Sequence, residues 1–176
     1  MLSIEILIAF FSASLLLALV PGPDNIFVLT QSIFQGKKSG LIIMLGLCTG
    51  LIFHTLAVAF GVAVVFQTSE IAFTILKIIG AMYLLYLAWQ IFNAPTEKID
   101  TENKDISIDY KKLYYRGIIM NITNPKVSIF FLAFLPQFTN PALGTVSLQM
   151  LLLGALFIFA TILIYYLRDI KYQNSK

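Results

Sequence analysis

Long apolar runs, separated by short polar segments, dominate this chain. The runs cover Ile4–Val20, which continues after a break through Ile26–Phe34, then Gly40–Phe66, Ile71–Phe92, Gly117–Phe138 and Thr145–Leu167. Each run is close to or longer than the roughly 20 residues that an α-helix needs to cross a bilayer. We therefore predict an all-α fold, a polytopic membrane helix bundle with five transmembrane helices, in which the interrupted first run counts as one.

The composition agrees with this pattern. The 176 residues are 59% hydrophobic and 12% charged, which reverses the balance of a soluble globular domain. The N-terminus carries Glu5 and has no basic residue before Lys37, so we expect the first run to remain as a helix and not to be cleaved as a signal peptide. Cys48 is the single cysteine, which excludes an intramolecular disulfide and a cysteine metal cluster.

The basic residues outside the runs lie on alternate connections. Lys37 and Lys38 follow the first span, and further basic residues lie between the third and fourth spans and after the fifth. The connections at 67–70 and 139–144 contain no Lys or Arg. Because basic connections stay in the cytoplasm, we predict that the N-terminus faces out and that the C-terminus is cytoplasmic. The net charge of +3 is then explained by the basic residues of the cytoplasmic connections, and no nucleic-acid partner is predicted.

Prolines interrupt the first and fourth spans, and an ionisable residue follows each interruption. The residues concerned are Pro21, Gly22, Pro23, Asp24 and Asn25 in the first break, and Asn121, Asn124, Pro125 and Lys126 in the second. Because proline lacks an amide hydrogen, each break frees backbone carbonyls and exposes a helix N-terminus with partial positive charge. A charged side chain inside a membrane is costly and indicates a function. The alternative is that the prolines only kink their helices.

These breaks suit a solute that carries both charges. Asp24 or a freed carbonyl can hold an ammonium group, and a helix N-terminus can hold a carboxylate. We predict that the path of a small amino-acid substrate is lined by Asp24, Asn25, Asn121, Asn124 and Lys126. For the two asparagines of the second break, repair of the local backbone is an equal alternative.

The two breaks also occupy corresponding places in oppositely oriented parts of the chain. We predict a first inverted repeat of three spans at 1–92, a cytoplasmic linker at 93–116, a second, incomplete repeat of two spans at 117–167 and a cytoplasmic tail at 168–176. Interrupted helices at matching places in inverted repeats are the best sequence indication of a transporter site near the membrane midplane.

A few other polar or small residues lie inside the runs. His54, the only histidine, could relay protons or bond to a neighbouring carbonyl. Gly46 and Gly50 form a small-xxx-small pattern that predicts close helix packing. The sequence shows no phosphate-binding loop, no paired-histidine metal helix and no Ser/His/Asp set. It therefore predicts no enzyme, no catalytic residue, no metal site and no cofactor.

Three blocks in order resemble the LysE/RhtB family of amino-acid exporters. They are Val20–Asn25, reading VPGPDN, Lys77–Tyr86, reading KIIGAMYLLY, and Gly117–Pro136, reading GIIMNITNPKVSIFFLAFLP. The resemblance implies a bacterial inner-membrane exporter of amino acids such as homoserine, threonine, leucine or lysine, driven by the proton motive force. The family motif falls on Pro21, Gly22, Pro23 and Asp24, and on Asn124, Pro125 and Lys126.

Members of that family usually have six spans, so we expect this chain to lack the sixth. It could be a truncated exporter, or a homo-oligomer could supply the missing wall. Two other functions stay open: a non-transporting remnant or accessory membrane subunit, and an exporter of inorganic cations. The cation exporter has little support, because only Asp24 and His54 offer ligands within the spans.

Overall fold

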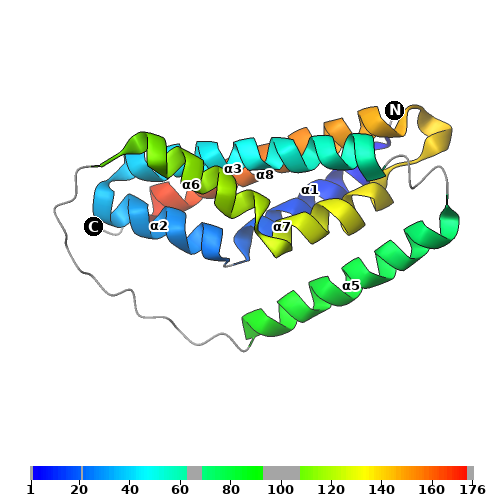
Figure 1. Ribbon diagram of the computed structural model, residues 1–176, viewed down its shortest axis with the longest axis horizontal. Helices are drawn as coiled ribbons and strands as arrows, with labels where there is room; N and C mark the ends of the chain where they lie inside the picture. Colours follow the sequence, from blue (N-terminus) through cyan, green and yellow to red (C-terminus); the bar gives the residue numbers. More distant parts are fainter. Residues whose placement is uncertain (1, 21, 63–68, 93–107, 174–176) are drawn as a thin grey trace.

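The computed structural model describes residues 2–20, 22–62, 69–92 and 108–173, and in these ranges it contains helices and no β-strand (Figure 1). The α-helices are α1 (Ile4–Leu19), α2 (Pro23–Gln35), α3 (Lys37–Ala57), α5 (Glu70–Phe92), α6 (Tyr110–Ile122), α7 (Pro125–Ile129) and α8 (Val146–Gln173). A π-helical turn, η1 (Val58–Val62), extends α3, and η2 (Phe130–Phe134) and η3 (Leu135–Phe138) extend α7. A short turn, η4 (Pro141–Leu143), precedes α8. The all-α prediction is confirmed; Pro21 and most of the predicted linker lie outside the described residues.

Two continuous segments are long and apolar enough to cross a membrane: Lys37–Gly61 and Val146–Leu167. Two further pairs pass the same test as bent spans, α1 with α2 at 60° and α6 with Pro125–Phe138 at 50°. The described helices thus supply up to four spans by length and composition, and α5 adds a helix of 23 residues with an apolar stretch at Thr74–Tyr83. The chain is a polytopic helical membrane protein, and the two predicted breaks are present.

Local capping explains where the helices depart from the predicted boundaries. Gly36, at φ 85°, separates α2 from α3, so α3 begins at Lys37 and not at Gly40. The Asp109 carboxylate accepts a hydrogen bond from the Lys112 amide at 3.1 Å, so α6 begins inside the segment predicted as linker. The same bond lowers the pKa of Asp109. At the other end of the chain, α8 continues to residue 173 through most of the predicted tail.

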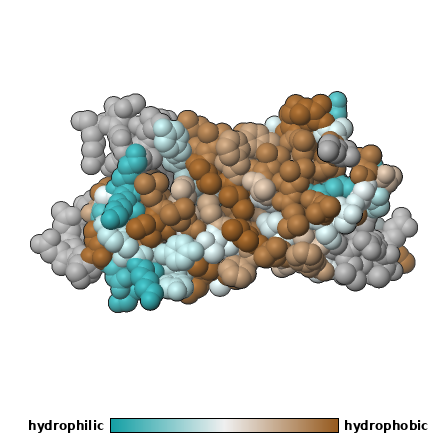
Figure 2. Space-filling view, turned by 90° about the horizontal axis from the view of Figure 1, so that it is seen from above, coloured by the Kyte–Doolittle hydropathy of each residue, from teal (hydrophilic) through white to brown (hydrophobic). Residues whose placement is uncertain are grey.

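The surface and the ends of the bundle are arranged as a membrane protein requires. Figure 2 shows apolar surface across the middle of the molecule, with hydrophilic residues gathered toward its ends. Side chains such as Leu16, Phe60 and Leu148 are strongly exposed, as expected for contact with lipid. The two termini lie at opposite ends of the bundle, and the starts of α3 and α6 lie at the C-terminal end (Figure 1).

Among the described residues, two apolar clusters make up the core. The larger joins α1, η2 and α8 through aromatic rings: Phe130 lies 5.9 Å from Phe10 and 5.1 Å from Phe157, measured between ring centroids. The smaller cluster includes Leu47 and Tyr165 and packs α2, α3, α6 and α8 nearer the C-terminal end. The polar residues of the helix breaks lie where these clusters meet.

Glycines allow α3 and α6 to lie very close together. A side-chain carbon at Gly46 would collide with the carbonyl oxygen of Tyr114, and one at Gly117 would lie 2.5 Å from the carbonyl oxygen of Ile43. A carbon at Gly50 would lie 2.6 Å from the Asn121 side chain. The predicted close packing at Gly46 and Gly50 is confirmed, and it brings Asn121 into the centre of the bundle.

Candidate functional site

The two helix breaks meet in the middle of the bundle. Lys126, in the first turn of α7, places its Nζ 3.6 Å from Oδ1 of Asp24, in the first turn of α2. The same Nζ donates a hydrogen bond of 3.3 Å to the carbonyl of Val20, just after α1 ends. The charged residues that followed the two prolines in the sequence therefore form one ion pair.

Because both side chains are buried, each charge depends on the other for its compensation. The side chains of Asp24 and Lys126 are only 9% and 8% exposed. The carboxylate lies at the positive end of α2, and the ammonium lies beside a carbonyl at the negative end of α1, so each charge faces the end of a helix dipole with the opposite sign. Breaking such a pair by removing one partner costs about 3–5 kcal/mol, because it leaves an uncompensated buried charge.

Gly22 makes room for the pair. A side-chain carbon at this position would lie 2.6 Å from Oδ1 of Asp24 and 2.9 Å from Nζ of Lys126. Its φ of −136° is extended backbone that any residue adopts. A glycine is therefore needed here because a larger residue would not fit beside the ion pair, and not because of its backbone conformation. The prolines of the two breaks lie where helices begin. Pro23 is the first residue of α2 and Pro125 is the first residue of α7, positions at which the missing amide hydrogen is tolerated.

Asn25 joins three helices. Its Nδ2 donates to the carbonyls of Ala18 at 2.9 Å and Val20 at 2.8 Å, which repairs the open end of α1. Its Oδ1 accepts a hydrogen bond of 2.5 Å from the hydroxyl of Tyr165 on α8. This residue, which we predicted as part of the solute path, thus also holds the first break together.

The two asparagines of the second break play different parts. Asn124 caps α7, because its Oδ1 accepts a hydrogen bond from the Lys126 amide at 3.0 Å. Asn121 lines a small cavity at the centre of the bundle. Its Oδ1 is buried without a hydrogen-bond partner among the described residues. Backbone repair therefore describes Asn124, while Asn121 keeps a free acceptor beside the ion pair.

His54 lies at the edge of this arrangement. Its Nε2 is 3.2 Å from the carbonyl oxygen of Asn121, and its ring lies 5.7 Å from that of Phe131. The contact agrees with the second of the two predicted roles, in which the histidine bonds to a neighbouring carbonyl. A role in relaying protons stays a prediction.

A small cavity of about 20 Å³, the polar cavity, lies at the meeting point of the breaks. Its polar lining residues are Asp24, Asn25, Asn121, Lys126, Thr161 and Tyr165. A cavity of this size holds about one water molecule, so the site is closed to a larger solute in this conformation. Among the described residues, no group of three or more His, Cys, Asp or Glu could hold a metal ion.

Two of these residues, Thr161 and Tyr165, were not among the predicted site residues. With Phe157 they line one face of α8 at intervals of four residues, and all three border the cavity. Two hydroxyls one turn apart in an apolar span, those of Thr161 and Tyr165, could have indicated this face from the sequence.

The comparisons with known proteins agree with this architecture. The chain matches the family of LysE type translocators over residues 15–168. It is 30% identical over 165 residues to the uncharacterized membrane protein YrhP of Bacillus subtilis (strain 168), covering 89% of this chain and 78% of that protein. It is 38% identical over 146 residues to the homoserine/homoserine lactone efflux protein of Salmonella typhi, covering 83% and 70%. No solved structure matches.

The matched region includes both helix breaks, the buried ion pair between them and the face of α8 that lines the cavity. The resemblance found in the three sequence blocks is thereby confirmed. The chain belongs to the family of LysE type translocators.

Proposed function

We propose that this protein exports a small amino acid, or a close derivative of one, across the bacterial inner membrane in exchange for protons. As a translocator it lies in a membrane and moves a small molecule. The efflux of homoserine and its lactone by a relative supports this solute class. The observation that carries the proposal is the buried Asp24–Lys126 pair at the junction of two helix breaks.

A zwitterion can replace this pair without leaving a charge alone. The solute carboxylate would bind Lys126, and the solute ammonium would bind Asp24 and the free Oδ1 of Asn121. Two new ion pairs then replace one, which offsets the cost of removing the solute from water. The cavity must widen on binding, because about 20 Å³ does not admit an amino acid.

Proton coupling follows from competition for one carboxylate. When Asp24 takes up a proton from outside, it can no longer hold the solute ammonium, and the solute leaves. When the site faces the cytoplasm again, the proton dissociates and Asp24 pairs once more with Lys126. Each cycle thus carries a solute outward and a proton inward.

The orientation that this exchange needs is supported by charge. The starts of α3 and α6 and the C-terminus lie at one end of the bundle, which places Lys37, Lys38, Lys111 and Lys112 together. By the positive-inside rule this end is cytoplasmic, with the N-terminus outside. The two bent pairs, α1–α2 and α6–α7, would then be the matching breaks of two inverted repeats.

The test is homoserine flux into or out of proteoliposomes that contain the full chain, with and without an imposed pH gradient. We expect flux that the gradient drives, and a loss of at least tenfold in Asp24→Asn and in Lys126→Met. Glu5→Gln and Lys112→Met make the same chemical changes at exposed positions and should transport normally.

Unfolding measurements in detergent separate a lost site from a lost fold. Each single change should destabilise the protein by about 3–5 kcal/mol, and the double change should recover part of that loss, because it leaves no unpaired charge. Full transport by both single variants would disprove the assignment of the pair. A stable protein that moves none of homoserine, threonine, leucine or lysine would instead favour the non-transporting alternative.

A further inference from the structure

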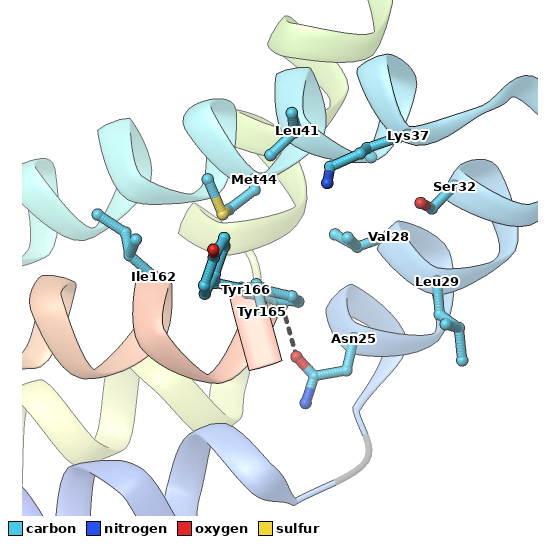
Figure 3. Close-up of a pocket in the computed structure, with 11 residues that line it drawn as sticks. Asn25, Val28, Leu29, Ser32, Lys37, Leu41, Met44, Ile162, Tyr165 and Tyr166 are labelled. Atoms are coloured by element: carbon cyan, nitrogen blue, oxygen red, sulfur yellow. Dashed lines mark hydrogen bonds between the residues drawn. The ribbon is translucent and has the colours of Figure 1, made fainter. Parts of the chain in front are cut away.

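A second, larger chamber of about 260 Å³ lies beside the polar cavity, between α2, α3 and α8 (Figure 3). We call it the vestibule; its walls include Val28, Leu41, Met44 and Ile162, with Ser32 and Lys37 among its polar members. Because α3 starts at Lys37, the vestibule lies toward the end of the bundle that carries the C-terminus and the basic residues.

The vestibule and the polar cavity share two lining residues, Asn25 and Tyr165. The hydroxyl of Tyr165 donates the 2.5 Å hydrogen bond to Oδ1 of Asn25, and both side chains are buried. Figure 3 shows this bonded pair at the edge of the vestibule, and because both residues also line the polar cavity, we infer that the pair separates the two chambers.

The two members of the pair are held differently. Asn25 is fixed to the end of α1 by its two bonds to backbone carbonyls. Tyr165 reaches it from α8 through a long side chain that can rotate about two torsions. A swing of the tyrosine ring would join the chambers and leave the bonds between Asn25 and α1 intact.

The volumes of the two chambers show why the position of the Tyr165 ring matters for a solute. The polar cavity alone holds about one water molecule. Joined to the vestibule of about 260 Å³, it approaches the roughly 300 Å³ at the lower end of small-molecule sites. A solute can therefore reach the ion pair from this side only when the tyrosine has moved.

The vestibule also has a chemical preference. Figure 3 shows the Lys37 side chain extending from the start of α3 toward the chamber, where its ammonium would attract a carboxylate. The remaining wall is mostly apolar and would accept a short uncharged side chain.

We propose that the vestibule is the cytoplasmic loading subsite for a small carboxylate-bearing solute, and that the Tyr165–Asn25 hydrogen bond is the latch between this subsite and the ion pair. The loading role rests on the proposed export function. The latch does not, since it can be tested without any solute.

The latch is tested by thiol labelling of the full chain in a Cys48→Ala background. Thr161→Cys places a thiol in the polar cavity, and Ser32→Cys places one in the vestibule. We expect N-ethylmaleimide to label position 161 slowly, and roughly five- to tenfold faster once Tyr165→Phe removes the hydrogen bond. Labelling at position 32 should be the same with either residue at 165, which shows that the fold is intact.

Tyr114→Phe is the matched control for this change. The Tyr114 hydroxyl is hydrogen-bonded to Thr49 Oγ1 at 2.8 Å and lines neither chamber. It should leave labelling at position 161 unchanged. An unchanged rate in Tyr165→Phe, or an equal rise in Tyr114→Phe, would overturn the latch.

The loading subsite is tested by protection. Homoserine should slow labelling at position 32, and Lys37→Met should raise the homoserine concentration for half-protection by about two- to fivefold, whereas Lys38→Met should not. If a protein that exports homoserine shows no protection at position 32, the loading subsite is wrong. If the latch result holds but no flux occurs, the export function fails and the latch stands.

Discussion

At the scale of single residues, opposite charges and small side chains decide what the centre of the bundle can do. Asp24 and Lys126 are buried in an apolar interior, where each is the ion-pair partner of the other and where Lys126 also bonds to the carbonyl of Val20. Gly22 leaves just enough room for their side chains. In the proposed export cycle, a solute would replace each internal partner in turn.

Gly22→Ala tests that fit. The added carbon would press on both members of the ion pair and displace them, so we expect homoserine flux to fall at least tenfold while the protein still folds. The flux assay in proteoliposomes measures it, and Gly61→Ala, where nothing lies within 4 Å of the added carbon, serves as control. A Gly22→Ala protein that transports at the parent rate would mean that the pair does not need its observed geometry.

At the scale of helices, prolines and glycines have separate tasks. Pro23 and Pro125 begin new helices, and the chain bends there by 60° and 50°. Gly46 and Gly117 let α3 and α6 approach until their backbones touch. The bends direct the ionisable residues inward, and the close approach of α3 and α6 brings Asn121 against Gly50.

Gly46→Ala should therefore destabilise the bundle. Its new methyl group meets the backbone of α6, which cannot rotate away as a side chain would, and we expect a loss of about 1–3 kcal/mol. Thermal unfolding in detergent measures this loss. Gly61→Ala, in the exposed turn after α3, should lose no stability, and equal melting of the two variants would contradict the importance of the α3–α6 contact.

At the scale of the whole molecule, the site lies between two apolar clusters inside a bundle whose surface is apolar across its middle. The lysines at the starts of α3 and α6 lie at the C-terminal end of the bundle, which agrees with the proposed orientation. Assembly into a homo-oligomer stays a prediction.

Reporter fusions test this orientation. Green fluorescent protein fused after residue 176 should fluoresce, since it folds in the cytoplasm, whereas alkaline phosphatase at the same place should be inactive. Alkaline phosphatase inserted in the turn Pro141–Leu143 should be active outside. The reverse pattern of activities would show that the bundle is inserted the other way round.

Much of this architecture could be predicted from the sequence. Apolar runs predict helices because the bilayer forces every backbone polar group to bond within its own segment. The breaks were predictable at Pro23 and Pro125 because the missing amide hydrogen acts on the residue's own helix. The candidate residues Asp24 and Lys126 followed from the cost of placing charge in an apolar run.

Only the tertiary structure decided which of these residues meet. The 3.6 Å ion pair, the contact of His54 with the Asn121 carbonyl and the hydrogen bond between Tyr165 and Asn25 each join residues from different helices. The sequence alone determined the helices, their breaks and the charges beside them, since those depend on local backbone chemistry and on transfer into lipid. The register and spacing of packed helices depend on contacts such as Gly46 with Tyr114, made between residues far apart in the chain, and that packing decided where the cavity lies and which side chains line it.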